Sequence, residues 1–314
     1  MKIIDKQQVE QLLHYPSLIE ALRQAFRQDY QVPQRQHYAV KQPENAKDNT
    51  LLLMPAWELG AYLGVKTVMV APENGRYDLP AIQGVYTLFD AHKGTPLASI
   101  DAPALTAKRT AAASALASSY LSRDNSSALL MIGTGALAPE LIKAHASVRP
   151  LQQAYIWGRN FAKADALARR LSSRSLKVNA VPKIEEAVGQ VDIISCATLS
   201  SQPLLWGKWL RPGQHIDLVG AYLPDSRESD DAVIQQSQIF VDTRPGATQE
   251  AGDLAIPLQQ GLIQMEAILA DLAELCKDLH PGRQQAQSIT LFKSVGHALE
   301  DLAAAKLIYS QLHS

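Results

Sequence analysis

The segment from Leu129 to Asn160 constrains the fold of this chain more than any other part of the sequence. It reads LLMIGTGALAPELIKAHASVRPLQQAYIWGRN: an apolar run precedes Gly133, Gly135 and Ala138 in the spacing G-x-G-x-x-A, and a helical pattern and a second apolar run follow. This order predicts a strand, a tight turn, a helix and a second strand around a dinucleotide pyrophosphate. An ordinary glycine turn is the competing interpretation, and the flanking patterns favour the nucleotide site.

Each small residue of this motif has a physical task. Gly133 would permit the turn, Gly135 would let backbone N–H groups approach the phosphates, and Ala138 would let the helix pack closely on the sheet. The positive N-terminal end of that helix would face the anion, because its first N–H groups have no partner within the helix.

The end of the second strand indicates which nucleotide binds. An NAD site usually has Asp or Glu there, about 20 residues after the glycines, to accept a hydrogen bond from the ribose 2′-OH. Here Gly158 ends the strand, and Arg159 and Asn160 follow it. A guanidinium pairs with a 2′-phosphate, and no carboxylate is present to repel one. The sequence therefore favours NADPH over NADH, with a solvated loop arginine as the alternative interpretation of Arg159.

Composition limits the classes of partner. Of the 314 residues, 46% are hydrophobic and 19% are charged, which predicts a globular protein of one large or two ordinary domains. The formal net charge is −1, so nothing favours nucleic acid or an anionic membrane as a partner. A small neutral or zwitterionic molecule fits better.

Targeting and metal-binding signals are not found in the sequence. Asp5 and Glu10 interrupt the first apolar stretch, and no apolar run reaches the roughly 18 residues of a transmembrane helix, so we expect a cytoplasmic protein. Cys196 and Cys276 are too few and too far apart for a disulfide framework or a zinc site. No His-Glu-x-x-His or paired Cys-x-x-Cys motif occurs, which predicts no metal.

The hydrophobic patterning changes along the chain. Residues 32–101 predict strands of an antiparallel sheet, after a short strand and two helices, and an alanine-rich helix follows over 102–122. Residues 127 to about 245 alternate strands with helical segments, which is typical of a parallel doubly wound sheet. Residues 294–312 predict an amphipathic helix with apolar positions such as Leu299 and Leu302, packed on the N-terminal domain.

These patterns give an α/β fold class with two domains. We expect a Rossmann-type, doubly wound parallel sheet that binds NAD(P) over residues 121–294. We expect an α+β domain over residues 1–120 and 295–314.

Three basic residues lie in apolar or small-residue surroundings. Lys66 interrupts the strand AYLGVKTVMV, Arg109 lies among alanines in TAKRTAAASALA, and Arg35 lies in VPQRQHYAV. A buried cation is costly without an anion, so together they would clamp a small carboxylate, Arg109 in a bidentate manner and Lys66 as a point charge. Taken singly, a strand lysine facing water or an arginine paired with an acid is the simpler interpretation. His37, beside Arg35, would enter the same pocket.

Several longer motifs make the chain resemble the ornithine cyclodeaminase and mu-crystallin family over nearly its whole length. The resemblance implies a substrate-binding and dimerisation domain formed by the N-terminal region and the last helix, a Rossmann domain between them, and a homodimer. The motifs are MPAW at 54–57, LGVKTV at 63–68, LPAIQGVYTLFD at 79–90, LTAKRTAAASALA at 105–117, the glycine turn at 133–138, VGAYLPDSRESD at 219–230 and LFKSVGHALEDLAAA at 291–305.

The resemblance also implies which residues form the site. Substrate binding is expected of Arg35, His37, Met54, Lys66 and Arg109. Cofactor binding is expected of a larger set, comprising Arg109, Gly133, Thr134, Gly135, Ala136, Leu137, Gly158, Arg159, Asn160, Cys196, Ala197, Thr198, Val219, Gly220 and Ser294.

One departure from the family pattern bears on the reaction. Ornithine cyclodeaminases have an acidic residue two positions after the glycine of a V-G-G-D-like motif, and Tyr222 occupies that position here. The segment GAYLPDSRE instead resembles the corresponding segment of ketimine reductases and of bacterial Δ1-pyrroline-2-carboxylate reductases, with Asp225 and Arg227 in the matching places. The resemblance therefore implies an NADPH-dependent oxidoreductase of proline metabolism that reduces cyclic imino acids.

The expected reaction converts Δ1-pyrroline-2-carboxylate to L-proline and Δ1-piperideine-2-carboxylate to L-pipecolate. A protonated C=N accepts hydride readily, so the protein mainly fixes the geometry between the nicotinamide and the imine. Lys66 and Asp225 are the two candidates for the catalytic proton source. The alternatives are an NAD(P)-dependent alanine or other amino-acid dehydrogenase, ornithine cyclodeaminase itself, and an NADP-gated small-ligand binding protein of the mu-crystallin type.

Overall fold

The computed structural model describes residues 1–43 and 47–313, and the chain divides into two compact units. Unit 1 comprises Met1–Arg109 and Ala298–Ser314, and unit 2 comprises Thr110–His297. The sequence places these boundaries at 120/121 and 294/295. The first boundary lies earlier because helix α3 (Ala102–Leu121) is divided: Arg109 pairs with residues of unit 1, whereas the Ser114 hydroxyl donates to Asp217 of unit 2 at 2.9 Å.

Unit 1 is built on a six-stranded sheet in the order β1-β6-β5-β4-β3-β2. Strands β2 to β6 are antiparallel to their neighbours, as the sequence predicts, and β1 is added parallel to β6. The strands are β1 (Lys2–Ile4), β2 (Gln36–Val40), β3 (Asn49–Trp57), β4 (Tyr62–Val70), β5 (Ile82–Asp90) and β6 (Pro96–Asp101). The helices are α1 (Lys6–Leu12), α2 (Tyr15–Arg27), the short 3₁₀ helix η1 (Asn74–Tyr77) and α11 (Ala298–Gln311).

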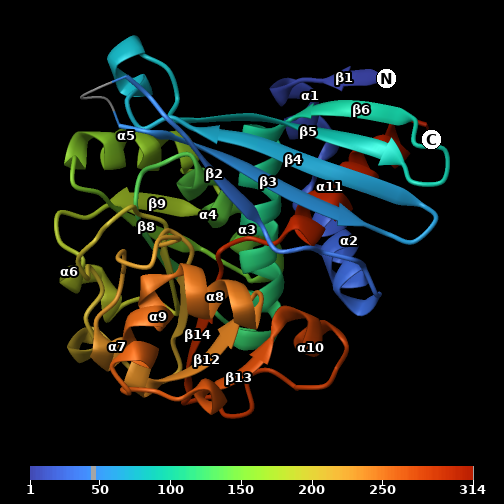
Figure 1. Ribbon diagram of the computed structural model, residues 1–314. Helices are drawn as coiled ribbons and strands as arrows, with labels where there is room; N and C mark the ends of the chain where they lie inside the picture. Colours follow the sequence, from blue (N-terminus) through green and yellow to red (C-terminus); the bar gives the residue numbers. More distant parts are fainter. Residues whose placement is uncertain (44–46, 314) are drawn as a thin grey trace. The chain divides into compact units, whose positions relative to one another are not determined.

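Helix α11 packs against α2 and against β3, β4 and β5, so the two helices lie side by side on one face of the sheet (Figure 1). The predicted helix and its packing on the N-terminal domain are confirmed, but its predicted amphipathic character is wrong. Every residue from Ala298 to Ala305 is buried, including Glu300 and Asp301, so the first half of the helix has no solvent-facing side. The predicted start is also too early, since residues 294–297 are not helical.

Unit 2 contains an eight-stranded sheet in the order β13-β12-β14-β11-β10-β7-β8-β9. All its pairings are parallel, which is the doubly wound Rossmann-type sheet that the sequence predicts. The strands are β7 (Ala128–Ile132), β8 (Gln153–Trp157), β9 (Lys177–Ala180), β10 (Ile193–Cys196), β11 (His215–Leu218), β12 (Ser237–Val241), β13 (Ile268–Asp271) and β14 (Ile289–Lys293). The strands predicted from the sequence end near residue 245 and do not include β13 and β14, although β14 lies between β11 and β12.

The connections between these strands are mostly helical (Figure 1). They comprise α4 (Leu137–Val148), α5 (Phe161–Leu171), α6 (Glu185–Val188), η2 (Gly207–Trp209), α7 (Asp231–Gln236), α8 (Arg244–Glu250), α9 (Gly252–Gln259), η3 (Met265–Ala267) and α10 (Leu272–Cys276). From β7 the chain adds strands in one direction, to β8 and β9, and then returns to add β10 on the other side of β7. This reversal is a topological switch point, where parallel α/β sheets bind ligands at the carboxyl ends of the strands.

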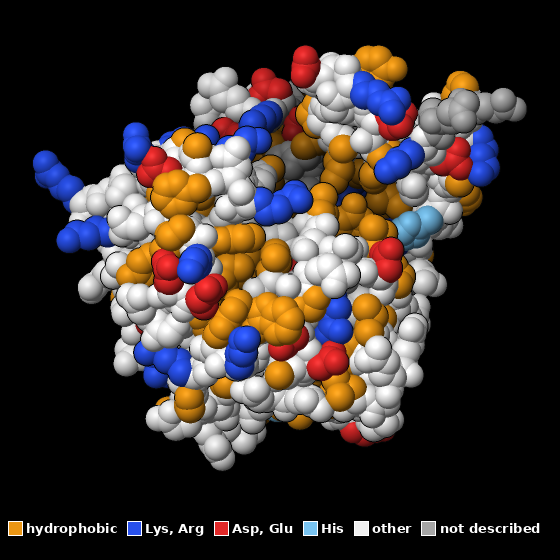
Figure 2. Space-filling model, turned by 90° about the vertical axis from the view of Figure 1, so that its left-hand side faces the viewer, with side chains coloured by type: hydrophobic (Ala, Val, Ile, Leu, Met, Phe, Trp, Pro, Cys, Tyr) orange, Lys and Arg blue, Asp and Glu red, His pale blue; other side chains and the backbone are white. Residues whose placement is uncertain are grey.

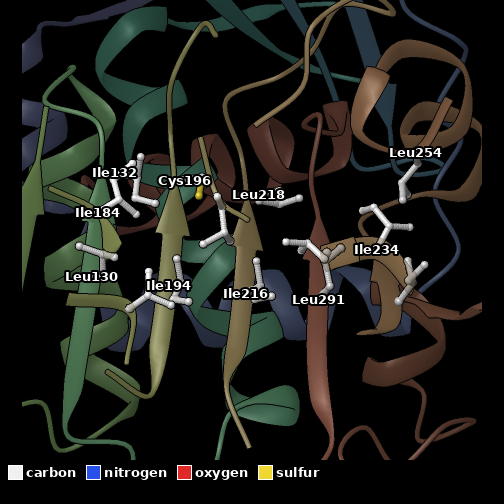
Figure 3. Packing of buried hydrophobic residues seen from close by; sticks show 14 of the residues in the cluster. Leu130, Ile132, Ile184, Ile194, Cys196, Ile216, Leu218, Ile234, Leu254 and Leu291 are labelled. Atoms are coloured by element: carbon white, nitrogen blue, oxygen red, sulfur yellow. The ribbon is translucent and has the colours of Figure 1, made fainter. Parts of the chain in front are cut away.

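The core of unit 2 is formed by apolar side chains on the central strands (Figure 3). Leu130, Ile194, Ile216 and Leu291 come from β7, β10, β11 and β14, and all four are fully buried. Burial of one such side chain stabilises a fold by about 1.5–3 kcal/mol. The strands around the switch point are therefore anchored in the core, and the loops of the site start from their carboxyl ends.

Acidic and basic side chains are interspersed among apolar ones on the face shown in Figure 2, in keeping with a net charge near zero. Among the described residues, no helix is long and apolar enough to cross a membrane.

Candidate active site

A cavity of about 330 Å³ opens in unit 2 at the switch point of the parallel sheet. Its walls come from the segments that follow β7, β8 and β10. The lining residues are Gly133, Thr134, Gly135, Trp157, Gly158, Arg159, Asn160, Lys163, Ala197, Thr198, Leu199, Ser200 and Leu204. Eight of the predicted cofactor residues are among them, namely Gly133, Thr134, Gly135, Gly158, Arg159, Asn160, Ala197 and Thr198.

The glycine turn has the geometry that its motif predicts. Gly133 has φ = 127°, and a Cβ atom there would lie 2.6 Å from the carbonyl oxygen of Ala197, so only glycine fits. A Cβ on Gly135 would meet no described atom within 4 Å, which leaves its backbone open to a ligand. Ala138 is fully buried in the first turn of α4. The turn therefore fits the pyrophosphate of a dinucleotide, at the N-terminal end of a helix.

Basic residues gather where the ribose of a dinucleotide would lie, after β8. Arg159 is exposed, and the Asn160 side chain caps α5 by accepting from the backbone N–H of Lys163 at 3.0 Å. Lys163 also lines the cavity, and the sequence analysis missed it. None of the described lining residues is acidic. This set of side chains therefore contains no negative charge that would repel an additional phosphate on the ribose.

The other predicted cofactor residues of unit 2 lie near strand ends but do not line this cavity. Ala136 and Leu137 begin α4, Cys196 ends β10, Val219 and Gly220 follow β11, and Ser294 follows β14. The Ser294 hydroxyl is buried and has no hydrogen-bond partner among the described residues. A buried hydroxyl without a partner is costly, so this group is suited to a ligand.

Unit 1 contains a buried cluster of charges formed by strand β4, helix α3 and helix α11. The Lys66 ammonium lies 2.8 Å from Asp301 Oδ2 and 3.0 Å from Oδ1, and it donates to the Thr106 hydroxyl at 3.4 Å. Arg109 donates from Nε to Asp301 Oδ1 at 2.8 Å and from Nη1 to Glu300 Oε2 at 2.6 Å. The structure thus brings Lys66 and Arg109 together through one carboxylate, although their separation in sequence did not predict it.

The two acids of this cluster were not predicted as functional residues. The signal was present in the sequence, because Glu300 and Asp301 are adjacent charges in the alanine-rich segment HALEDLAAA. The amphipathic interpretation assigned them to solvent. Their burial is tolerated because each accepts a charge-assisted hydrogen bond from a cation of the same unit.

The environment of Lys66 brings the pKa of its ammonium group closer to neutral pH. Burial lowers the pKa of Lys66 to about 8, the charges of Arg109 and Arg35 contribute in the same direction, and Asp301 opposes them. Burial alone would raise the pKa of Asp301, but Arg109 and Lys66 outweigh it and hold the pKa below its usual value. The carboxylate therefore stays ionised, and the ammonium next to it loses its proton more readily than an exposed lysine does.

Two further side chains accompany Lys66 in one row across the sheet. Met54 of β3 and Tyr86 of β5 are its cross-strand partners, and both are buried. The Tyr86 hydroxyl has no hydrogen-bond partner among the described residues, and a Cβ on Gly64 would lie 1.7 Å from it. Gly64 thus leaves space for this phenol. Burial, with the charge of Asp301, raises the pKa of Tyr86 well above its usual value and keeps it a donor.

The remaining predicted residues lie in less enclosed positions. Arg35 is half-buried immediately before β2, and His37 is exposed on that strand. Asp225 belongs to unit 2, whereas Lys66 belongs to unit 1, and its side chain is exposed, with a hydrogen bond of 3.5 Å from the adjacent Ser226 hydroxyl. The described residues contain no group of three or more His, Cys, Asp or Glu that could hold a metal ion.

Comparisons with known proteins identify the family and the relatives of this chain. The model of the ornithine cyclodeaminase/mu-crystallin family matches residues 2–314. Δ1-pyrroline-2-carboxylate reductase of Colwellia psychrerythraea is 39% identical over 321 residues, which cover 99% of each protein. The structure of Thermococcus litoralis Δ1-pyrroline-2-carboxylate reductase in complex with NADH and L-proline matches with a TM-score of 0.93 at 34% identity, over 100% of this chain and 98% of that chain. An archaeal alanine dehydrogenase dimer with bound NAD gives a TM-score of 0.91 at 29% identity, over 100% and 96%.

Proposed function

This chain belongs to the ornithine cyclodeaminase/mu-crystallin family, and we propose that it is a nicotinamide-dependent reductase of cyclic imino acids. Its substrates are Δ1-pyrroline-2-carboxylate, reduced to L-proline, and Δ1-piperideine-2-carboxylate, reduced to L-pipecolate. The observation that carries the proposal is the buried contact of Lys66 and Arg109 with Asp301, in a chain whose other unit has a dinucleotide cavity. The relatives that reduce Δ1-pyrroline-2-carboxylate, one of them in complex with NADH and L-proline, support it.

The cofactor of this proposal is NADPH, with NADH as a weaker alternative. Arg159 and Lys163 are the two cations that line the cavity, and the strand before them ends without a carboxylate. Either cation would pair with a ribose 2′-phosphate. The structural relatives bind NADH or NAD, so the preference for the phosphate depends on these two side chains of this chain.

The residues of unit 1 have the role of orienting the substrate. When bound, the reduced cofactor supplies the hydride. Arg109 and Lys66, with Arg35 and His37 at the edge of the same sheet, would hold the substrate carboxylate and so fix the adjacent C=N carbon. Met54, beside Lys66, would form the apolar wall against the ring.

Lys66 is the proton source in this proposal. With a pKa of about 8 it is largely protonated at pH 7 and can donate to the imine nitrogen, which must be protonated to accept hydride. Asp301 then remains as the counter-charge. Asp225, the other candidate, is exposed and accepts a hydrogen bond from the adjacent Ser226 hydroxyl, so we propose Lys66 ahead of it as the proton source.

The reaction is tested by following NADPH and NADH consumption with the five- and six-membered cyclic imines, each with and without ammonia. The proposal expects turnover of both imines without ammonia. An amino-acid dehydrogenase, which the archaeal alanine dehydrogenase neighbour makes the second candidate, would instead require a 2-oxo acid and free ammonia. Ammonia release from L-ornithine would indicate a cyclodeaminase, against which Tyr222 argues. Nucleotide-dependent binding of a large aromatic ligand without turnover would indicate a carrier.

The proposed enzyme acts as a homodimer through unit 1. The face of the six-stranded sheet opposite to Lys66 carries exposed apolar side chains, with Ile3 78%, Tyr38 50% and Val85 38% exposed. Apolar side chains concentrated on one sheet face are typical of a surface that another subunit covers. Light scattering after size exclusion tests this, with a mass of twice 34.3 kDa expected.

A further inference from the structure

Glu228 is a fully buried acid that neither the sequence analysis nor the proposed function uses. It lies in the segment between β11 and α7, and its carboxylate accepts four hydrogen bonds. Oε1 accepts from the Thr198 backbone N–H at 2.6 Å and from the Thr198 hydroxyl at 2.8 Å. Oε2 accepts from the backbone N–H of Gly220 at 2.6 Å and of Ala221 at 3.3 Å.

These four bonds join the loops at the carboxyl ends of two neighbouring strands. Thr198 follows β10 and lines the dinucleotide cavity, whereas Gly220 and Ala221 follow β11. The two loops are in close contact, because a Cβ on Gly220 would lie 2.0 Å from the carbonyl oxygen of Thr198 and 2.2 Å from its nitrogen. Glu228 therefore connects a loop that lines the cavity to the loop that follows the neighbouring strand.

An ionised carboxylate accepts all four of these hydrogen bonds at once. Each of its two oxygens faces two donors, and a carboxylate accepts at both oxygens. A glutamine or a protonated glutamic acid would present a hydrogen toward donors at one of these positions. At Oε2 that contact would be repulsive and two backbone N–H groups would lose their acceptor. At Oε1 the backbone N–H of Thr198 would lose its acceptor and the Thr198 hydroxyl would have to accept instead of donate.

A second buried layer fixes Glu228 itself. Asp253 of α9 accepts from the backbone N–H of Glu228 at 2.8 Å and of Ser229 at 3.2 Å. The same carboxylate is 3.1 Å from the Lys293 ammonium, and both side chains are fully buried. Lys293 ends β14, so the residues that hold Glu228 connect it to a third strand of the same sheet.

We propose that Glu228 is a positioning residue for the dinucleotide cofactor: it holds Thr198 and the turn after β11 in the conformation that receives the nucleotide. The inference rests on the proposed function only for the class of ligand, and it concerns cofactor affinity rather than the identity of the imine. Glu228 itself does not touch the cofactor; it acts through Thr198.

The test measures NADH binding to the purified protein by fluorescence titration, without any imine. We expect Glu228→Gln to raise the Kd for NADH about tenfold or more, as expected for the loss of a charge-assisted hydrogen bond. Glu228→Asp keeps the charge on a shorter side chain, so its Kd should lie between those of the wild type and Glu228→Gln. Glu186→Gln, an exposed acid of the same unit, is the matched control and should bind as the wild type does.

Steady-state kinetics separates positioning from general destabilisation. Positioning raises the KM for the cofactor and leaves kcat at saturating cofactor close to that of the wild type, whereas a damaged fold lowers both kcat and Tm. An unchanged Kd in a Glu228→Gln variant that folds, as judged by circular dichroism, overturns the inference. If the wild type reduces no cyclic imine but Glu228→Gln still weakens NADH binding, the proposed function fails and this inference stands.

Discussion

Lys66 and Asp301 form a buried ion pair although 235 residues separate them in the sequence. Their nearest charged atoms are 2.8 Å apart, and the side chains are 3% and 0% exposed. The same carboxylate also accepts from Arg109, so it compensates two cations at once. The proposed substrate site in unit 1 therefore includes this acid beside the cations that were predicted to bind the substrate.

The pH dependence of the reaction should report the charge of Lys66. If Lys66 must be protonated, kcat/KM falls as the pH rises through its pKa of about 8. Asp301 raises this pKa, so Asp301→Asn should move the fall to lower pH. Glu300→Gln changes the neighbouring acid on the same helix, and it should shift the fall in kcat/KM less than Asp301→Asn does. A profile of kcat/KM from pH 6 to 10 measures this, and equal profiles for Asp301→Asn and the wild type would remove Lys66 from the proton transfer.

Replacement of Arg109 should weaken substrate binding. Arg109→Ala removes a guanidinium that would hold the substrate carboxylate, and we expect the KM for the imine to rise about 10- to 100-fold. Arg109→Lys should retain part of the affinity, because it keeps the charge but not the bidentate geometry. Both variants also weaken the pairing with Glu300 and Asp301, so Tm is measured alongside the kinetics. A KM near that of the wild type in a folded variant would exclude Arg109 from the substrate site.

The cations after β8 should decide between the two nicotinamide cofactors. Arg159→Ala and Lys163→Ala should each raise the KM for NADPH, and the double variant should raise it about tenfold. The KM for NADH should change little in all three variants. Lys183→Ala is the control, because Lys183 is exposed in the same unit and does not line the cavity. Parallel titrations with both cofactors test this. Equal effects on NADPH and NADH would contradict a role in binding the 2′-phosphate.

The two glycines of the turn should respond differently to alanine. Gly133→Ala places a Cβ 2.6 Å from a backbone oxygen at a positive φ, so it should lower Tm as well as cofactor affinity. Gly135→Ala meets no described atom within 4 Å, so the protein should fold normally and lose only the cofactor. Thermal unfolding with and without NADPH distinguishes them. Normal NADPH binding by Gly135→Ala would show that the pyrophosphate lies elsewhere.

Cofactor binding should weaken as the pH falls. The pKa of Glu228 is raised to about 7, mainly by burial and further by the charge of Asp253. The charge of Lys293 and the hydrogen bonds from Thr198 oppose this increase. Protonation removes an acceptor at the cavity wall, so the Kd for NADH should be higher at pH 6 than at pH 8. NADH is the suitable probe, since a 2′-phosphate would itself titrate near pH 6. Cys196, another titratable group near this carboxylate, remains a neutral thiol because burial raises its pKa well above the usual value. A Kd that is constant over this range would mean that Glu228 stays ionised.

Sequence patterns predicted much of unit 2, because the signals there are local. Within one short segment of the sequence lie the glycine spacing, the apolar strands and the residues after β8. The structure places this segment around one cavity. Strand β14 was missed because its apolar run ITLFK is short and follows a polar loop instead of a predicted helix.

The charge cluster of unit 1 could be predicted only in part. The apolar surroundings identified Lys66 and Arg109, but their partners come from α11, and periodicity gives no information on contacts between distant segments. The adjacent acids Glu300 and Asp301 resemble a solvated helix face in sequence. Their burial becomes evident only when the helix packs on the sheet that contains Lys66.

The position of α11 in the chain also sets an order for synthesis. The ribosome releases Lys66 and Arg109 long before Asp301, so during translation both cations must remain hydrated and strand β4 cannot bury its charged face. A nascent chain that stops before residue 300 would leave these cations without their acids. Unit 1 can therefore bury Lys66 and Arg109 away from water only after the last helix has been synthesised.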